Sequence, residues 1–137
     1  MAYQIRRVDY FKATVKDQPG EAYRLLSQLA DLGVNLVAVN MVPIGPMTTQ
    51  VTLFPEDSHQ FTHVAAQAKL ALSGPQRALL IRGEDMLGSL VGIHAKLAAV
   101  KVNVFASSGV SDGQGHYCYL LNVRPEDYER AARTLEV

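Results

Sequence analysis

The sequence predicts an α+β fold built from two similar modules in tandem, with antiparallel sheets that carry their helices on one face. The main observation is an internal repeat, because residues 17–39 and 85–107 align at a constant offset of 68. Both stretches also show the same alternation of strand-like and helix-like segments. A repeat of this kind indicates duplicated modules that pack on each other. We place the first module at residues 1–74 and the second at residues 75–137.

Seven of the 23 aligned positions in the repeat are identical. They are Asp17/Asp85, Gly20/Gly88, Leu29/Leu97, Ala30/Ala98, Val34/Val102, Asn35/Asn103 and Ala38/Ala106. Further along the chain the offset grows by two, since Pro55 reappears as Pro125. We expect this slip to fall in a hairpin turn, where insertions are tolerated best.

The first copy is expected to follow the order β-α-β-β-α. Residues 8–15 are rich in β-branched and aromatic types, which is typical of a strand. An Asp-x-Pro-Gly segment ends this strand, and leucines at helical spacing follow until Gly33. Strands at residues 35–43 and 48–54 and a helix at residues 56–72 complete the copy.

The second copy repeats this order, with strands at 78–81, 102–108 and 116–123 and helices at 85–99 and 126–135. Each copy is therefore one strand short of the β-α-β-β-α-β ferredoxin-like unit. We expect the copies to share strands. Residues 3–7 would extend the first strand into the second copy's sheet, and residues 76–82 would serve both copies.

The helical spacing also predicts which residues form the core. Leu25 and Leu29 of the first copy align with Ile93 and Leu97 of the second, and we expect all four to be buried. His94 takes the place of Leu26, so we expect it to be partly buried and hydrogen-bonded.

The composition limits the classes of protein to which the chain can belong. The chain has 137 residues, of which 48% are hydrophobic and 19% charged, as in a globular protein. Thirteen basic and thirteen acidic residues cancel, so no broad basic field exists for nucleic acid or a membrane surface. A single cysteine excludes an intramolecular disulfide, and no apolar stretch resembles a signal peptide or a membrane span. We therefore expect a soluble cytoplasmic protein.

The residues around the first turn point to a known family. A strand, the segment Asp17-Gln18-Pro19-Gly20, a helix ending near Gly33 and then Val34-Asn35-Leu36 together resemble the ACT domain. The second copy keeps Asp85, Gly88 and Asn103 but has Leu87 in place of the usual proline and Lys101 in place of glycine. The resemblance covers almost the whole chain as a tandem pair.

The resemblance implies a stand-alone regulatory module that binds an amino acid and is not an enzyme. In ACT domains the ligand commonly lies between two modules, at the loop after the first strand and the start of the next helix. A helix N-terminus suits a carboxylate, and glycine lets the backbone approach a ligand. The ligand-binding candidates are Asp17, Gln18, Pro19, Gly20, Asn35, Asp85, Met86, Leu87, Gly88 and Asn103. The resemblance implies no cofactor.

Each candidate also has a purely structural interpretation. Asp17 and Asp85 could cap the helices that follow them, and the two glycines could serve tight helix–strand packing. Asn35 and Asn103 could close turns by bonding to the backbone. If ligand is bound, we expect the first loop to be the better binder, because Pro19 stiffens it.

Other constellations give weaker predictions. His59 and His63 share a helix face without a third ligand, so we expect a solvated pair and no metal. Cys118 is expected to pack beside Tyr117 and Tyr119, and those tyrosines lack the basic residues that RNA binding needs. Two alternatives stay open: a ligand-free interaction module that serves as regulatory subunit of a metabolic enzyme, and a small enzyme. Because two small modules leave open strand edges, we also expect a homodimer.

Overall fold

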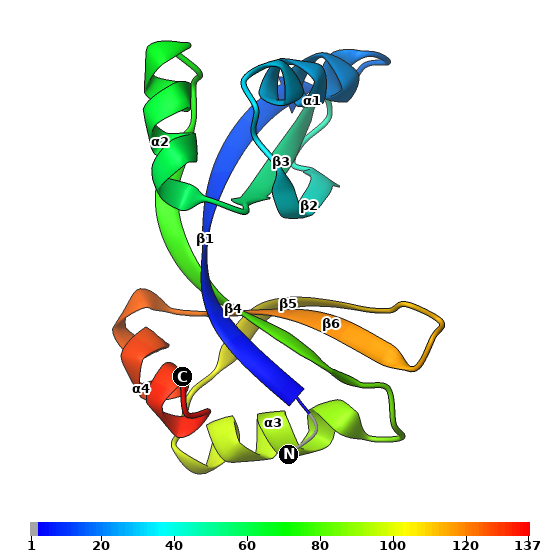
Figure 1. Cartoon of the computed structure of the whole chain (residues 1–137), viewed down its shortest axis with the longest axis vertical. Coiled ribbons are helices and arrows are strands. Elements are labelled where there is room, and N and C mark those ends of the chain that lie inside the picture. Colours follow the sequence, from blue (N-terminus) through cyan, green and yellow to red (C-terminus); the bar gives the residue numbers. More distant parts are fainter. Residues whose placement is uncertain (1–2) are drawn as a thin grey trace. The chain divides into compact units, whose positions relative to one another are not determined.

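The computed structural model describes residues 3–137 and contains six strands, four α-helices and one short 3-10 turn (Figure 1). Their order along the chain is β1 (Tyr3–Lys16), α1 (Glu21–Asp31), β2 (Leu36–Pro43), β3 (Thr48–Pro55), α2 (Ser58–Gln67), β4 (Ser73–Glu84), α3 (Ser89–Ala99), β5 (Val104–Ser111), β6 (His116–Val123), η1 (Pro125–Asp127) and α4 (Tyr128–Thr134). This order confirms the predicted α+β fold with two βαββαβ units.

The chain forms two compact units that exchange strand segments. The first unit is Asp9–Gln76. The second unit combines the residues up to Val8 with Arg77–Val137. The strands follow the order β2-β3-β1-β4-β6-β5, so β1 and β4 are the central pair and each contributes to both units. The expectation that the copies share strands is confirmed. The shared range of β4 differs from the expected residues 76–82, because residues 73–76 belong to the first unit and the rest of the strand to the second. The module boundaries at 1–74 and 75–137 stay a prediction about the repeat.

The repeat extends to the details of strand pairing. β5 begins and ends 68 residues after β2, and β6 begins and ends 68 residues after β3. A shift in register occurs at the same place in both hairpins, between Leu36 and Ala38 and between Val104 and Ala106. The duplicated sequence therefore specifies the same irregularity twice.

The two-residue slip is not in the hairpin turn, and that prediction was wrong. The turns are equal in length, and equivalent bonds close them: Ile44 N–H to Thr48 O at 3.0 Å and Asp112 N–H to His116 O at 2.9 Å. The extra residues lie after β6, where η1 precedes α4. In the first copy α2 begins directly after Asp57, whose side chain accepts a hydrogen bond from Gln60 N–H.

The helices that follow β1 and β4 begin later than expected. Gly20 and Gly88 are the N-cap residues, with φ of 89° and 74°, and no side chain caps either helix. The prediction that Asp17 and Asp85 could be the caps was wrong. The chain needs a left-handed residue directly before the first helical turn, and glycine adopts that conformation without strain.

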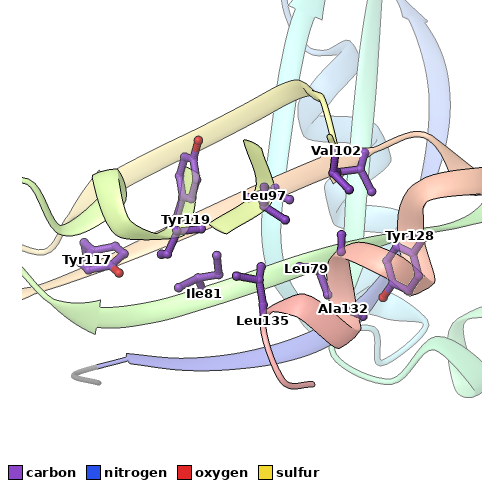
Figure 2. Packing of buried hydrophobic residues seen from close by; sticks show 13 residues of the cluster. Leu79, Ile81, Leu97, Val102, Tyr117, Tyr119, Tyr128, Ala132 and Leu135 are labelled. Atoms are coloured by element: carbon purple, nitrogen blue, oxygen red, sulfur yellow. The ribbon is translucent and has the colours of Figure 1, made fainter. Parts of the chain in front are cut away.

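Each unit has its own hydrophobic core on the helix-bearing face of its strands. The core of the first unit joins β1, β3, α1 and α2, and its buried members are Phe11, Leu29, Val51, Leu53, Phe61 and Ala65. In the second unit, Figure 2 shows Leu79 and Ile81 of β4 packed with Leu97 of α3 and with residues of β6 and α4. Burial of Leu29, Ile93 and Leu97 is confirmed, whereas Leu25 is only half-buried against its cluster.

Alternation along β6 decides the positions of its aromatic and cysteine side chains. Tyr117 and Tyr119 are buried in the core, whereas Cys118 between them is exposed. The prediction that Cys118 packs in the core was wrong, because successive side chains of a strand point to opposite faces.

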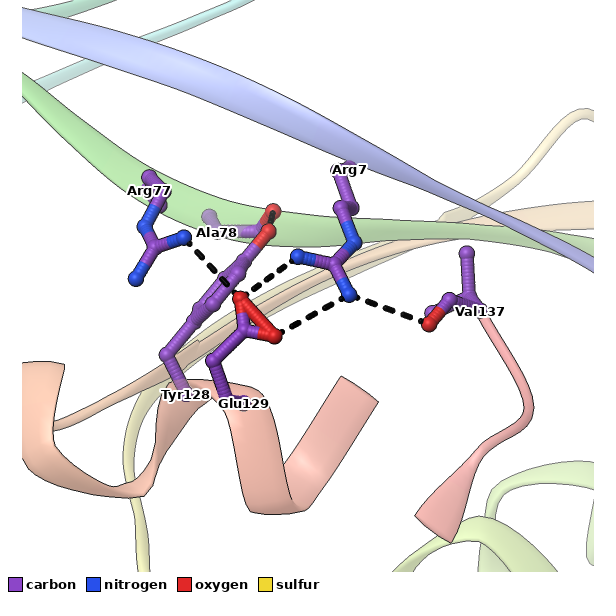
Figure 3. Close-up of polar contacts among 6 residues, drawn as sticks. All are labelled: Arg7, Arg77, Ala78, Tyr128, Glu129 and Val137. Atoms are coloured by element: carbon purple, nitrogen blue, oxygen red, sulfur yellow. Dashed lines mark hydrogen bonds and ion pairs between the residues drawn. The ribbon is translucent and has the colours of Figure 1, made fainter. Parts of the chain in front are cut away.

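A polar cluster holds the start of the chain to α4 within the second unit (Figure 3). The Arg7 guanidinium donates to both carboxylate oxygens of Glu129, at 2.7 and 3.3 Å, and to the Val137 carbonyl at 3.2 Å. Arg77 donates to the same carboxylate at 3.1 Å and stacks over the Tyr128 ring, with Cζ 4.2 Å from its centroid. The Tyr128 hydroxyl donates to Ala78 O at 3.1 Å.

This cluster predicts an acid-dependent loss of stability. The hydrogen bond from Arg7 lowers the pKa of Glu129 below its ordinary value of 4.5, and the charges of Arg7 and Arg77 act in the same direction. A carboxyl whose pKa is lower in the folded state contributes stability above its unfolded pKa and loses it as the pH falls through the folded value. We expect Glu129→Gln to flatten the fall in melting temperature below about pH 4.5.

The measurement is thermal unfolding of wild type and Glu129→Gln between pH 7 and pH 3, and Glu136→Gln is the control on an exposed carboxylate next to the chain end. Equal acid dependence of all three proteins would contradict the role given to Glu129.

Within residues 3–137, no helix has the length and apolar character needed to cross a bilayer.

Candidate functional site

A pocket of about 500 Å³ lies in the second unit, between the start of α3 and the β5–β6 hairpin. One side consists of the β4–α3 loop and the first turn of α3, and the other consists of strand residues near the hairpin end. The lining residues are Asp85, Met86, Gly88, Ser89, Leu90, Val91, Gly109, Val110, Ser111, Tyr117, Cys118 and Tyr119. Three of the ten predicted site residues, Asp85, Met86 and Gly88, therefore line one pocket.

Local hydrogen bonds fix the shape of the β4–α3 loop. Met86 N–H donates to the Ser89 hydroxyl oxygen at 2.9 Å, and that oxygen lies 2.7 Å from Met86 O and 3.0 Å from Glu84 O. Asp85 N–H donates to Gly115 O at 2.8 Å, which ties the loop to the hairpin turn. A loop that is held by its own hydrogen bonds loses little conformational entropy when it binds a ligand.

Asp85 gives the pocket its negative charge. Its Oδ2 accepts a hydrogen bond from the Ser111 hydroxyl at 2.9 Å, and Ser111 Oγ in turn accepts from Gly113 N–H at 3.1 Å. Burial raises the pKa of Tyr117, so its phenol is uncharged at neutral pH. Asp85 is the only acidic or basic residue among the twelve that line the pocket, which pairs one anionic group with uncharged walls.

The strand side of the pocket is built around Tyr119. A Cβ on Gly109 would come within 2.9 Å of Tyr119 Cδ1, so the ring packs directly on the glycine backbone. At its other end the Tyr119 hydroxyl lies 2.8 Å from His94 Nε2. This bond confirms the expectation that His94 is partly buried and hydrogen-bonded, and it fixes the position of the tyrosine.

The first loop has the same anchoring but different surroundings. Asp17, Gln18, Pro19 and Gly20 form an exposed turn, in which Asp17 N–H donates to Met47 O at 2.9 Å. At the offset of the repeat, the residues in the places of Ser89, Gly109 and Tyr119 are Glu21, Met41 and Val51. Glu21 forms an ion pair with Arg24. The residues that form the pocket walls in the second unit are therefore not repeated at the equivalent positions of the first copy.

The two asparagines lie away from the loops. Asn35 and Asn103 follow the C-terminal ends of α1 and α3, whereas the loops precede the N-terminal ends. Each helix has eleven residues, which separates its ends by roughly 16 Å. Asn35 Nδ2 donates to Glu56 Oε2 at 2.7 Å, and Glu56 N–H donates back to Asn35 O at 2.8 Å. Their contact with a ligand stays a prediction, and neither lines the pocket.

Two further findings concern the remaining candidates. The Leu87 side chain is fully exposed and does not line the pocket. His59 and His63 are both exposed on α2, as expected, and residues 3–137 contain no group of three or more His, Cys, Asp or Glu that could hold a metal ion.

Most of the pocket walls were not predicted from the sequence. The missed residues are Ser89, Leu90, Val91, Gly109, Val110, Ser111, Tyr117, Cys118 and Tyr119. A glycine inside a strand often marks close packing against its backbone. Gly109 lies inside β5 and has such a contact, but the predicted strand at 102–108 ends one residue before it, so the sequence carried no such signal.

Comparison of the sequence with models of protein families gives no match, and comparison with curated proteins gives none either. Comparison of the structure with solved structures does give matches over nearly the full chain. These matches identify the class of fold, an ACT-like arrangement of two βαββαβ units, and confirm that part of the prediction.

Two structures illustrate the similarity. Protein BT0572 from Bacteroides thetaiotaomicron matches with a TM-score of 0.78 and 12% sequence identity, over 98% of this chain and 88% of that one. The regulatory subunit of aspartate kinase from Thermus thermophilus, in its ligand-free form, matches with a TM-score of 0.65 and 15% identity, over 99% and 95% of the two chains. At these identities the similarity concerns the fold alone.

Proposed function

We propose that this protein is a regulatory module that binds a free amino acid in the pocket at the start of α3. The observation that carries the proposal is the pocket itself, in which a preformed loop, a helix N-terminus and one carboxylate face uncharged walls. The fold supports it, because the chain resembles regulatory subunits of aspartate kinase along its whole length. The protein would act by binding and would have no catalytic activity of its own, and a cytoplasmic location stays a prediction.

The two charged ends of an amino acid have complementary partners at this site. The N-terminus of α3 presents the positive end of the helix dipole, which favours a carboxylate, while Ser89 N–H and Val91 N–H already donate to Met86 O and Gly88 O. The Asp85 carboxylate favours an ammonium group, and it is held in place by Ser111. We therefore keep Asp85, Met86 and Gly88 as ligand contacts and give a smaller role to Asp17, Gln18, Pro19 and Gly20.

Thermal shift measurements with the twenty amino acids test the proposal. A ligand present at a hundred times its dissociation constant stabilises the folded state by about 2.7 kcal/mol, which raises the melting temperature of a domain of this size by several degrees. If no amino acid at millimolar concentration shifts the melting temperature, the proposal fails.

A matched pair of glycine variants locates the site. Gly88→Val is expected to weaken amino-acid binding more than Gly20→Val, because Gly88 lines the pocket. Both glycines have positive φ, so both variants carry a similar backbone strain. This ranking is opposite to the one expected from the sequence, and calorimetric titration of both variants decides between them. A larger loss of amino-acid affinity in Gly20→Val would indicate that the ligand binds at the first loop.

The alternative function, a ligand-free regulatory subunit of a metabolic enzyme, is favoured by one observation. Leu87 is fully exposed and Val91 is 68% exposed, so the start of α3 presents apolar side chains outward. Under this alternative Leu87→Lys would abolish association with the enzyme, whereas amino-acid binding would not occur. Under the main proposal Leu87→Lys leaves amino-acid affinity unchanged, because Leu87 does not line the pocket.

We also propose a homodimer. β2 and β5 each pair with one neighbour only, so each leaves an unpaired strand edge, and such edges favour pairing with another chain. Light scattering at micromolar concentration is expected to give twice the chain mass of 15.0 kDa. A mass of one chain across the concentration range would contradict the dimer.

A further inference from the structure

We infer that the pocket selects amino acids with an uncharged, apolar side chain, and that it places their ammonium group at Asp85. The inference rests on the proposed function and adds to it the class of ligand and the orientation in which it binds.

Apart from Asp85, the walls of the pocket carry no charge. The apolar lining residues include Met86, Leu90, Val91 and Val110. Moving a charged or strongly polar side chain from water to such walls costs free energy unless a partner replaces its hydration. Among the lining residues no second charged group exists to act as that partner, whereas an apolar side chain loses only water contacts there.

The hydroxyl groups of Ser89, Ser111 and Tyr119 are already paired. The Ser89 hydroxyl bonds within its own loop, and the Tyr119 hydroxyl bonds to His94 Nε2. The Ser111 hydroxyl bonds to Asp85 and accepts from Gly113 N–H. A ligand side chain would have to compete with these bonds to gain a polar contact with one of the three hydroxyl groups. Asp85 keeps acceptor capacity, because a carboxylate offers about four lone-pair sites and Ser111 uses one.

The first copy differs from the second at the equivalent positions. Its residues in the places of Ser89 and Val91 are Glu21 and Tyr23, so a charged group stands where the second copy has a neutral wall. Position-matched variants of the first loop therefore serve as controls for the second.

The first experiment is calorimetric titration of the full chain with a ligand series. Affinity is expected to rise from glycine through alanine and valine to leucine by about fourfold for each buried methylene. Lysine and aspartate are expected to bind at least tenfold more weakly than leucine. Equal affinity across the series, or tighter binding of a charged amino acid, would overturn the inference while the proposed function would stand.

The second experiment changes the selectivity. Val91 is 68% exposed, so Val91→Asp leaves the core intact. It is expected to invert the preference so that lysine binds more tightly than leucine. The control Tyr23→Asp changes the equivalent residue of the first copy, which is 74% exposed, and is expected to leave the preference unchanged. An unchanged preference in Val91→Asp, with wild-type circular dichroism, would overturn the inference.

The third experiment tests the orientation. Asp85→Asn keeps the acceptor for Ser111 but removes the charge, and it is expected to weaken leucine binding about tenfold. Asp17→Asn, its repeat partner, is expected to have no effect. If Asp17→Asn causes the loss instead, the ligand lies at the first loop and the inference fails although the protein binds amino acids. If no amino acid binds the wild type, the proposed function fails as well.

Discussion

Replacing Leu29 with alanine is expected to lower the free energy of unfolding by about 2–5 kcal/mol. Leu29 is 1% exposed and packs in the core of the first unit with Phe11 and Phe61. Removing its three outer carbons loses the transfer free energy of buried apolar atoms and leaves a cavity that neighbouring elements fill only partly. Since a small domain has a total stability of about 5–15 kcal/mol, this loss is a large fraction of the whole.

The repeat supplies a matched test of this prediction. Leu97 occupies the equivalent position in α3 and is also 1% exposed, so Leu97→Ala is expected to cost a similar amount. The control is Tyr23→Ala, on the exposed face of α1, where we expect a change within about 0.5 kcal/mol. Urea denaturation measures the free energy of unfolding of all three variants, provided that its slope against urea concentration stays the same. A loss below about 1 kcal/mol for either leucine would mean that its core can close over the gap.

Much of the fold could be predicted because each prediction depended on local pattern. Helical spacing of leucines and isoleucine gave the buried face of α1 and α3, and the repeat transferred it from one copy to the other. The count of strands was enough to expect sharing, since a unit of this kind needs one more strand than each copy contains. These inferences required no knowledge of which distant residues meet.

Errors arose where the chain depends on backbone conformation that composition does not reveal. The segment Ser73-Gly74-Pro75 is typical of a helix end, yet β4 begins at Ser73. Proline is accepted there because it lies near the start of the strand. Asp17 and Asp85 have the side chain of a helix cap, but the cap position belongs to a glycine three residues later, because that position has positive φ.

Only the loop side of the candidate site was predictable, for a related reason. The loop with Asp85, Met86 and Gly88 is contiguous in sequence and carries a motif. The opposite wall comes from β5 and β6, about twenty to thirty residues later in the chain, and is brought to the loop only by strand pairing and the packing of α3. Without tertiary structure, Gly109 falls in a predicted turn and Tyr119 is an ordinary strand residue.

Replacing Gly74 with alanine is expected to be as damaging as the loss of a core leucine, by about 2–5 kcal/mol. Gly74 lies at the start of β4 with φ of 131°, a conformation that alanine adopts only under strain. A Cβ there would come within 2.9 Å of both Phe11 Cδ2 and the Tyr10 carbonyl oxygen of β1. The carbonyl is backbone and cannot rotate away, so the two strands must separate locally.

Gly92→Ala is the control for this prediction, because the same change is made where neither obstacle exists. Gly92 lies inside α3 without positive φ, and a methyl group added to it would meet no atom within 4 Å outside its own helix backbone and chain neighbours. Alanine is the better helix former, so this variant is expected to gain about 0.5–1 kcal/mol. Urea denaturation of both variants gives opposite signs if β1 and β4 approach as closely at Gly74 as described. A Gly74→Ala protein within about 1 kcal/mol of wild type would show that this part of β4 has room for a side chain.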